Sequence, residues 1–373
     1  MAFDENSSAS SYSLDDMNDK FALDVLPAIL FLCLVMVVGS SGNVVVCFVY
    51  CGRKTSVTRT FILALAVVDL NNCVFNIPAD VADIRYKYTF GSSKMCPASR
   101  FWIAFSSIAS CSILVAIAIE RYQKICKPFQ KQTTPKTAMA AIVICCVSAV
   151  VFAIPAAVLN GNRDVTIRGL NGSDCGIKNE FKGKAFPKTF NAILFFLFCC
   201  ASGTIIATYM LIWKRLRAQK ALIKKASRGV ICDTTERAHQ LGNARTSDVS
   251  FGYTATTFAP ETTTDPTARS TQEPDTGPHQ MTQNSSASVD KTTLMMFLVS
   301  ILFIVSFLPY IIITTISAVD RNVLRNLTGA DLVSYTIATR FHFINSAFNP
   351  VAYSITSSGF RTYLKKRTKE WFA

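Results

Sequence analysis

A charged triplet, Glu120-Arg121-Tyr122, directly follows an apolar run at 103–119 that holds no charged residue. Charges at the edge of a membrane-spanning helix are costly, so a carboxylate and a guanidinium placed there are candidates for an electrostatic function. Counted back along a helix at about 1.5 Å per residue, Cys96 lies roughly 37 Å from Arg121, which is the thickness of a bilayer with its interfaces. The two positions therefore mark opposite faces of a membrane.

A second candidate group is Asp69, which lies in the middle of another apolar stretch. A lone carboxylate at that depth must be protonated, paired or neutralised by an ion. Ser110 in the third apolar stretch, and Asn345, Ser346 and Asn349 on one face of the last one, offer oxygen atoms that suit a small cation. Two interpretations stay open: a sodium site, or a polar network that only fixes helix packing.

Two prolines interrupt the last two apolar stretches. Pro350 follows Asn349, whose side chain can satisfy a backbone group that the proline frees. Pro309 follows Phe303 and Phe307, which are one helical turn apart and can both press into the centre of a bundle. Kinked helices with bulky side chains are candidate hinges, although prolines in membrane helices are often only structural.

The polar and charged groups described above lie within or beside long apolar blocks, which must position them. Half of the residues are apolar and 17% are charged. The apolar residues come in blocks rather than in alternation, which favours spanning helices. Blocks long enough to cross a bilayer lie at 26–50, 60–84, 98–119, 137–159, 190–213, 294–319 and 332–356. The sequence predicts an all-α membrane protein, a seven-transmembrane helix bundle with a short amphipathic cytoplasmic helix after the seventh span.

The distribution of charge gives the orientation. A net charge of +14 would suit a nucleic-acid binder, but the basic residues gather in four groups that seven crossings place on one side, at 53–54, 124–136, 214–225 and 365–369. The acidic amino terminus falls on the other side, although the outer loop 163–188 is mildly basic too. By the positive-inside rule we expect a multi-pass protein of the plasma membrane with an extracellular N-terminus, a cytoplasmic C-terminus and no nucleic-acid partner.

Two kinds of covalent modification are expected on the outer side. Cys96 and Cys175 are the cysteines that fall outside with a free partner, so we expect them to form a disulfide. Asn6, Asn171 and Asn326 begin glycosylation tripeptides that this topology places outside. Such tripeptides arise often by chance, so they support the topology only weakly.

The segments outside the spans differ in composition. Residues 1–25 are expected to be an extracellular disordered tail, 26–213 to hold the first five spans, and 291–356 the last two. Loop 214–290 begins as a basic helical extension and becomes Thr-, Ser- and Pro-rich, which indicates disorder. Its hydroxyl groups could accept phosphate from receptor kinases and recruit arrestin. Residues 357–373 have one apolar and one basic face, which predicts a helix that lies on membrane lipid.

The chain resembles the rhodopsin-like, class A, G-protein-coupled receptors over nearly all of its spanning region. Each motif alone is weak, but their order and spacing are specific to that family: Gly42-Asn43, Leu65 with Asp69, Cys96, Glu120-Arg121-Tyr122, Phe303 with Pro309, and Asn349-Pro350 with Tyr353. The resemblance implies a ligand-operated receptor that is not an enzyme and needs no cofactor, apart from an allosteric sodium ion.

The resemblance also implies residue roles. Arg121 would be held by its acidic neighbour at rest and released when the sixth helix swings out to admit a heterotrimeric G protein. An agonist would need to prefer the open form by only a few kcal/mol. Tyr209 and Tyr353 match tyrosines that stabilise the open form. The sodium pocket of the family matches Asp69, Ser110, Asn345 and Ser346.

Some positions depart from the family pattern and leave the coupling between pocket and cytoplasmic face open. The fourth span has no tryptophan, Ala201 stands where a proline is usual in the fifth, and Phe307 replaces the usual tryptophan in the sixth. None of these changes the predicted fold.

The ligand class is narrowed by two positions. Ile103 stands where receptors for biogenic amines in the family carry an aspartate, so an amine lacks its anchor. Phe343 stands where opsins hold their retinal-binding lysine, so no Schiff base can form. Ile103 therefore disfavours an amine receptor, and Phe343 excludes a retinal protein.

The upper pocket is expected to hold Asp80, Tyr310 and Arg340 beside Ile103 and Phe343. Asp80 and Arg340 could bind opposite charges of a peptide or neutralise each other, and the internal pair is favoured because intramembrane charges are usually matched. For His342 we expect a hydrogen-bonded packing role rather than metal binding.

A short peptide, in particular a neuropeptide, suits this mixture of charged and apolar groups. Alternatives are a lipid or another small molecule, or a ligand scavenger that does not signal. The intact Glu120-Arg121-Tyr122 favours signalling. An enzyme would need paired catalytic groups in the spans and a transporter would show internal repeats, and the sequence shows neither.

Overall fold

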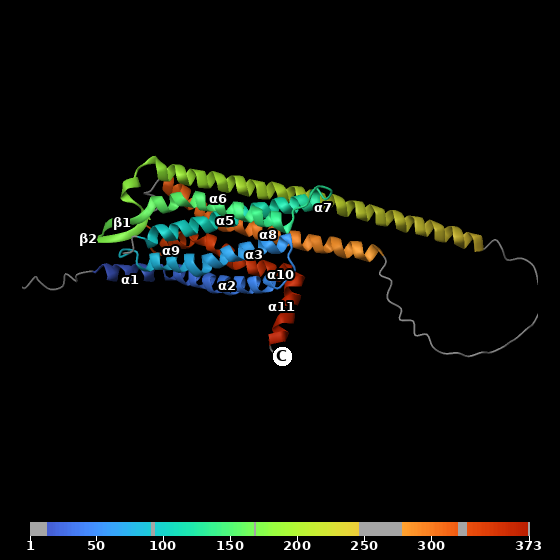
Figure 1. The fold of residues 1–373 in the computed structure, drawn as a ribbon, viewed down its shortest axis with the longest axis horizontal. Helices are drawn as coiled ribbons and strands as arrows, with labels where there is room; N and C mark the ends of the chain where they lie inside the picture. Colours follow the sequence, from blue (N-terminus) through green and yellow to red (C-terminus); the bar gives the residue numbers. More distant parts are fainter. Residues whose placement is uncertain (1–12, 91–93, 168, 246–277, 320–326, 372–373) are drawn as a thin grey trace, which may run out of the picture. The chain divides into compact units, whose positions relative to one another are not determined.

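The computed structural model describes residues 13–90, 94–167, 169–245, 278–319 and 327–371, and these are almost entirely helical (Figure 1). The helices and strands are α1 (Leu14–Asp24), α2 (Leu26–Cys51), α3 (Val57–Asn71), a π-helical segment (Asn72–Asn76), α4 (Ile77–Arg85), α5 (Met95–Cys126), α6 (Pro135–Leu159), β1 (Asn160–Ile167), β2 (Leu170–Ile177), α7 (Ala185–Arg245), α8 (Pro278–Val319), α9 (Gly329–Ala338), α10 (Ile344–Thr356) and α11 (Ser358–Trp371).

The chain divides into two compact units, Met1–Leu211 with Asp290–Ala373, and Ile212–Val289. The first unit contains the spanning helices, apart from the end of the span Ala185–Leu222, and every residue of the candidate site. In the second unit, α7 continues to Arg245 and α8 already begins at Pro278. Part of the loop predicted to be disordered is therefore helical, namely the residues up to Arg245 and those from Pro278 onward. Residues 246–277 lie outside the described residues.

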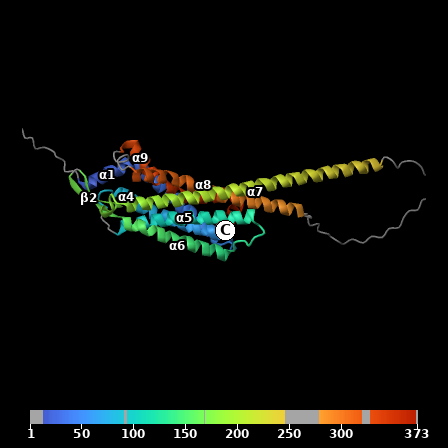
Figure 2. The same ribbon diagram turned by 90° about the horizontal axis from the view of Figure 1, so that it is seen from above.

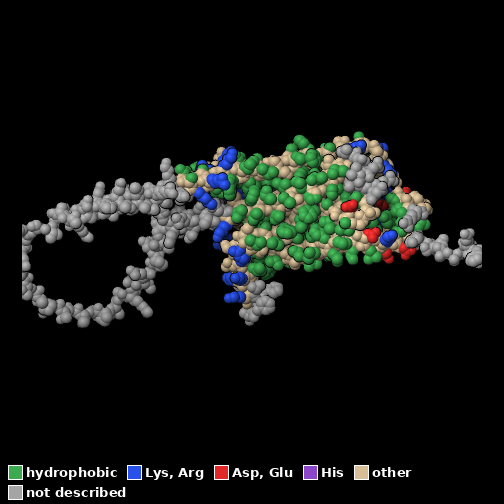
Figure 3. Space-filling view, turned by 180° about the vertical axis from the view of Figure 1, so that it is seen from behind, with side chains coloured by type: hydrophobic (Ala, Val, Ile, Leu, Met, Phe, Trp, Pro, Cys, Tyr) green, Lys and Arg blue, Asp and Glu red, His purple; other side chains and the backbone are tan. Residues whose placement is uncertain are grey.

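Six helical stretches of the described residues are long and apolar enough to cross a membrane: Leu26–Cys51, Val57–Arg85, Met95–Cys126, Pro135–Leu159, Ala185–Leu222 and Lys291–Ser317. The seventh apolar block falls on α9 and α10, which a 3₁₀ turn at Phe341–Phe343 separates, so neither helix alone reaches spanning length. In the view of Figure 3, apolar side chains cover the middle of the bundle surface, Lys and Arg gather at one end, and Asp and Glu lie at the other end together with some basic side chains. Such a belt is what a bilayer requires.

The bundle is held by close helix packing around α5, which runs along α6 in both ribbon views (Figures 1 and 2). Gly42 in α2 faces Pro350 of α10 so closely that an added Cβ would lie 2.8 Å from the proline ring. Asn43 donates a hydrogen bond of 2.8 Å to the carbonyl of Ser346. A small residue and a buried amide thus join the first and seventh spans.

Residues 14–24 form helix α1, which corrects the prediction of a disordered tail for that part. Ser13 starts the helix with a capping box, since its Oγ accepts from the Asp16 amide and the Asp16 carboxylate accepts from the Ser13 amide. The Asp16 carboxylate accepts hydrogen bonds from the Ser13 amide and from the Ser13 hydroxyl, and these two bonds, that from the amide above all, lower the pKa of Asp16. Residues 1–12, with Asn6, lie outside the described residues.

A β-hairpin, β1–β2, interrupts the otherwise helical chain and was not predicted. Its strands pair antiparallel, with Asn162 opposite Cys175. Gly172 in β2 lies against the carbonyl oxygen of Tyr88, where an added Cβ would come within 2.5 Å, so no larger residue fits. Asn171 is exposed on this hairpin, and Asn326 lies outside the described residues.

Candidate functional site

At one end of the bundle, Arg121 is buried in α5 and held from two sides. Its Nε lies 2.6 Å from Oε2 of Glu120, and both residues are more than nine-tenths buried. Its Nη2 donates a hydrogen bond of 2.6 Å to the hydroxyl of Thr58, near the start of α3. The adjacent Tyr122 has the ammonium of Lys127 5.7 Å from its ring centre. Thr58 was missed in the sequence, because a threonine in the first turn of a helix is unremarkable.

In the centre of the bundle, Asp69 accepts hydrogen bonds from the Ser346 hydroxyl at 2.9 Å and from the Asn349 amide at 2.6 Å. The carboxylate is completely buried. Ser110 and Asn345 are also buried, and no bond from either to Asp69 is present. Three buried oxygens, Ser110 Oγ, Asn345 Oδ1 and Asn349 Oδ1, have no hydrogen-bond partner among the described residues. Hard oxygen atoms left unpaired beside a carboxylate are the donor set that a sodium ion would take.

A chain of asparagines continues from this centre along the second span. Asn72 donates to the Ser346 hydroxyl at 3.1 Å, and Asn76 donates to Asn72 at 2.7 Å. Asn71 and Asn76 both donate to the hydroxyl of Ser106, at 2.8 and 3.2 Å. The helix widens to π geometry over Asn72–Asn76, a distortion often found at functional sites. The signal in the sequence was three asparagines in one apolar span.

The predicted hinge region of α8 is an aromatic cluster. The rings of Phe303 and Phe307 lie 4.4 Å apart, and the ring of Phe198 packs 6.4 and 6.3 Å from them. Pro309 lies within α8 and Pro350 within α10, without ending either helix.

The two tyrosines that the resemblance implied for the open form, Tyr209 and Tyr353, are buried. The Tyr209 ring packs 5.2 Å from that of Phe297. Neither hydroxyl has a hydrogen-bond partner among the described residues.

Toward the other end, a cavity of about 790 Å³ opens between α5, α6, α7 and α8. The five residues predicted for the upper pocket all line it: Asp80, Ile103, Tyr310, Arg340 and Phe343. A volume of this size suits a substantial ligand.

Charges at the cavity wall are paired with each other. Arg340 Nε lies 2.5 Å from Asp80 Oδ2, so the internal pair favoured from the sequence is present. Arg100 in α5 adds a second cation, 2.8 Å from Asp83 and 3.7 Å from Asp80. Two arginines therefore compensate two aspartates. Arg100 was missed, although its place in the first turns of the third span, level with two acidic residues of the second, was a usable signal.

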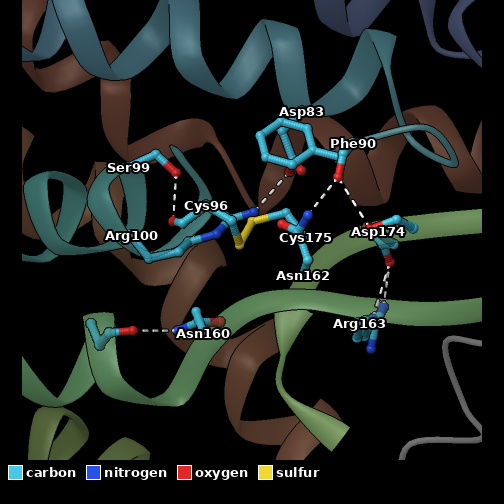
Figure 4. Close-up of a disulfide and its surroundings, with 12 residues drawn as sticks. Asp83, Phe90, Cys96, Ser99, Arg100, Asn160, Asn162, Arg163, Asp174 and Cys175 are labelled. Carbon is cyan, nitrogen blue, oxygen red and sulfur yellow. Dashed lines mark hydrogen bonds and ion pairs between the residues drawn. A yellow bond between two sulfur atoms is a disulfide. The ribbon is translucent and has the colours of Figure 1, made fainter. Parts of the chain in front are cut away.

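The hairpin is fixed in place by a disulfide (Figure 4). Cys175 in β2 is bonded to Cys96 in α5, as predicted. The carboxylate of Asp174 is buried between Arg163 at 2.5 Å and Lys87 at 3.0 Å. Asn162 donates to the carbonyl of Phe90 at 2.9 Å (Figure 4). The residues after the disulfide, Gly176 and Ile177, line the cavity, so the hairpin is part of its wall.

The described helices therefore form a bundle with a cavity toward one end and a buried ionic pair at the other. The chain belongs to the 7 transmembrane receptor (rhodopsin family), whose family model matches residues 42–353. The family confirms the seven-helix bundle and the multi-pass membrane location.

Several curated relatives are peptide receptors. The chain is 38% identical to neuropeptide FF receptor 2 of Mus musculus over 34% of this chain and 31% of that receptor. It is 29% identical to cephalotocin receptor 2 of Octopus vulgaris over 47% of this chain and 40% of that receptor. It is 23% identical to the allatostatin-A receptor of Bombyx mori over 94% of this chain and 81% of that receptor. The matches to the first two cover less than half of those receptors.

Proposed function

We propose that this protein is a receptor of the plasma membrane, with its N-terminus outside and its C-terminus in the cytoplasm, that binds an extracellular neuropeptide and activates a heterotrimeric G protein. The observation that carries the proposal is the pairing of two features in one bundle: a cavity with polar and apolar walls, and a closed ionic pair, Glu120–Arg121. Peptide receptors among the relatives support a peptide as the ligand.

The closed contacts of Arg121 supply the physical basis of the switch. The Thr58 hydroxyl can accept from the buried guanidinium only while α3 and α5 keep their present packing, whereas Glu120 neighbours Arg121 on α5 itself. A ligand that prefers an arrangement with Arg121 released shifts the population toward that form, to the extent of its differential affinity. The peptide would act through the aromatic cluster of Phe303 and Phe307, which lines the cavity.

A sodium ion is proposed as an allosteric ligand of the closed form. Asp69, Ser110, Asn345 and Ser346 would hold it, and it would neutralise the buried carboxylate. Sodium chloride should then raise the thermal unfolding midpoint of the purified receptor relative to choline chloride of equal ionic strength. Asp69→Asn should abolish the difference, and an equal sodium effect in that variant would rule out this site.

Further partners follow from the cytoplasmic segments. Receptor kinases would phosphorylate loop 214–290 and arrestin would bind the product, because added phosphates make a charged docking segment. Helix α11, with Arg361, Lys365 and Lys366, would lie on anionic membrane lipid. Glycosylation of Asn6, Asn171 and Asn326 is proposed on the outer side.

The test of the proposed function is a screen of randomised hexapeptides on cells that express the receptor, with calcium and cyclic nucleotide signals as readouts. Peptide-evoked signals that vanish in Arg121→Ala, at unchanged surface expression, support the proposal. Activation by lipids alone would contradict the peptide assignment.

A further inference from the structure

The charged residues that line the cavity are unequal in sign. Among the residues that the structure describes, Arg100, Arg340 and Asp80 are the charged ones in the lining, whereas Asp83, the partner of Arg100, lies outside it. The side chains of Arg100 and Arg340 are 27% and 18% exposed, and those of Asp80 and Asp83 only 5% and 8%. The cluster is neutral as a whole, but it presents its two cations to the cavity.

Both arginines keep N–H donors that the described part of the chain does not use. Arg340 donates through Nε and Nη1, and its Nη2 forms no hydrogen bond there. Arg100 donates through Nη2 to Asp83, its Nη1 lies 3.7 Å from Asp80, too far for a hydrogen bond, and its Nε has no partner. None of these three nitrogens is among the buried atoms that lack a partner, so each is accessible to a ligand.

A hydroxyl group adds to these donors, whereas the neighbouring imidazole does not. The Tyr310 hydroxyl forms no hydrogen bond with the described residues, is not among the buried unpaired atoms, and interacts electrostatically with Arg100. Both nitrogens of His342 are buried and unpaired within the described chain, although a backbone group of Thr339 approaches the ring, which packs on three aromatic rings. The packing role predicted for His342 is therefore present, and the predicted hydrogen bonds were wrong.

We infer that Arg100 and Arg340 together bind a carboxylate of the ligand, with the Tyr310 hydroxyl as a further donor. A carboxylate only accepts hydrogen bonds, so it matches a group of N–H and O–H donors and makes charge-assisted bonds with the guanidinium groups. An ammonium would meet the same donors with a positive charge and no acceptor. This inference rests on the proposed peptide function and deepens it by naming the group that the cavity selects.

The ion pairs with Asp80 and Asp83 do not cancel this attraction. A bound carboxylate would lie at hydrogen-bond distance from the guanidinium nitrogens, and Coulomb attraction falls with distance, so the nearer cations outweigh the carboxylates behind them. The two aspartates also hold the guanidinium groups in place, which lowers the entropy lost on binding. Apolar residues of the lining, such as Ile103 and Phe343, exclude water and strengthen the interaction.

The probe is a randomised hexapeptide library in four forms, which combine a free-acid or a carboxamide C-terminus with the presence or absence of Asp and Glu at the random positions. The form without any carboxylate should be about tenfold or more less potent than the best acidic form. Higher potency of the free acid without Asp or Glu assigns the carboxylate to the C-terminus, and higher potency of the carboxamide with them assigns it to a side chain. Equal potency of the carboxylate-free form would overturn the inference.

A second measurement requires no signalling. N-acetylphenylalanine and N-acetylphenylalaninamide both carry a ring for the apolar wall and differ in carboxylate against carboxamide. At equal concentration and ionic strength, the acid should raise the thermal unfolding midpoint of the purified receptor more than the amide does, because a ligand stabilises the state that it binds. No difference between the two compounds would contradict a carboxylate site.

A balanced double variant tests the residues without leaving a buried charge unpaired. Arg100→Gln with Asp83→Asn removes one of the two cations together with its carboxylate, so the potency difference between the best acidic and the carboxylate-free hexapeptides should fall about tenfold. Arg85→Gln with Asp19→Asn removes an ion pair of 2.5 Å outside the cavity lining and, as the matched control, should keep the difference. An unchanged difference in Arg100→Gln with Asp83→Asn would overturn the inference.

The outcomes separate this inference from the proposed function. Activation by hexapeptides with no preference for a carboxylate would overturn the inference alone. A preference of the purified receptor for the acid, with no hexapeptide form active on cells, would overturn the peptide assignment alone. Should Arg100→Gln with Asp83→Asn fail to reach the cell surface, Arg340→Gln with Asp80→Asn removes the other cation and should give the same loss.

Discussion

The proposed mechanism depends on single residues at the cavity and at the ionic pair of Arg121. Arg121 was found from the sequence because a charge next to an uncharged apolar run is conspicuous. Thr58, the second partner of Arg121, and Arg100, the second cation of the cavity, were not found from the sequence. The contacts that make each of them important form only when the helices pack together. The distances of 2.6 Å from Arg121 to Thr58 and 2.8 Å from Arg100 to Asp83 are therefore what the structure adds.

Thr58→Ala should raise signalling in the absence of ligand. A hydrogen bond to a charged group contributes about 1.5–3 kcal/mol. Its loss should therefore raise the ratio of molecules with Arg121 released to molecules with Arg121 held by about tenfold or more. Basal cyclic nucleotide or calcium signal, normalised to surface expression, measures this. Thr60→Ala, in the same helix but bonded only to the Ser56 carbonyl, is the matched control. Equal basal signals in the two variants would show that Thr58 does not restrain Arg121.

The Asp80–Arg340 pair should behave as a compensated buried unit. Asp80→Asn leaves Arg340 without its carboxylate, and Arg340→Gln leaves Asp80 with only Arg100 at 3.7 Å. Each change should cost about 3 kcal/mol, whereas the double variant should be more stable than either single one. Thermal unfolding of the detergent-solubilised receptor measures the three. Additive losses in the double variant would mean that the two charges act separately.

At the scale of elements, the spanning helices were predictable from the sequence, whereas helix α1, the β-hairpin and the break in the seventh span were not. A block of apolar residues sets where a spanning helix must lie, so the expected and observed spans agree closely, as with 137–159 and Pro135–Leu159. Helix α1 and the hairpin are polar in sequence and depend on particular contacts, Ser13 with Asp16 and Gly172 with Tyr88. The broken seventh span depends on the turn at Phe341–Phe343.

Helix α1 should detach when Asn18 is replaced by alanine. This buried amide donates to Thr89 at 2.7 Å and accepts from the Tyr88 amide at 2.8 Å, so Asn18→Ala leaves a buried donor unpaired and should cost about 1–3 kcal/mol. Hydrogen exchange over residues 14–24 should speed up while α5 stays protected. Ser41→Ala, which removes a hydroxyl bonded only to its own helix, serves as control. Unchanged exchange in Asn18→Ala would mean that other contacts hold α1.

The disulfide should fix the hairpin as one unit. Cys96→Ser and Cys175→Ser should each lower the free energy of unfolding by about 2–5 kcal/mol. The double variant should be no less stable than either single variant. Peptide binding and surface expression of the three variants give the comparison. A double variant clearly worse than both singles would mean that each cysteine contributes apart from the bond.

At the scale of the whole molecule, the account requires that the cavity and Arg121 communicate although they lie toward opposite ends of α5. The hydrogen bonds from Asn349 through Asp69, Ser346 and Asn72 to Asn76 offer a continuous polar connection through the centre. Distances of this kind could not be predicted from the sequence, because the two spans that contribute these residues, the second and the seventh, meet only in the folded bundle.

The most direct test of the central claim is to measure peptide binding and G-protein activation together in wild type and Arg121→Ala. The hexapeptide that activates wild type should bind the variant at the cavity and evoke no nucleotide exchange on the G protein. Full activation of Arg121→Ala by the same peptide would contradict the account, because the ionic pair at Glu120–Arg121 would then not be the output of the receptor.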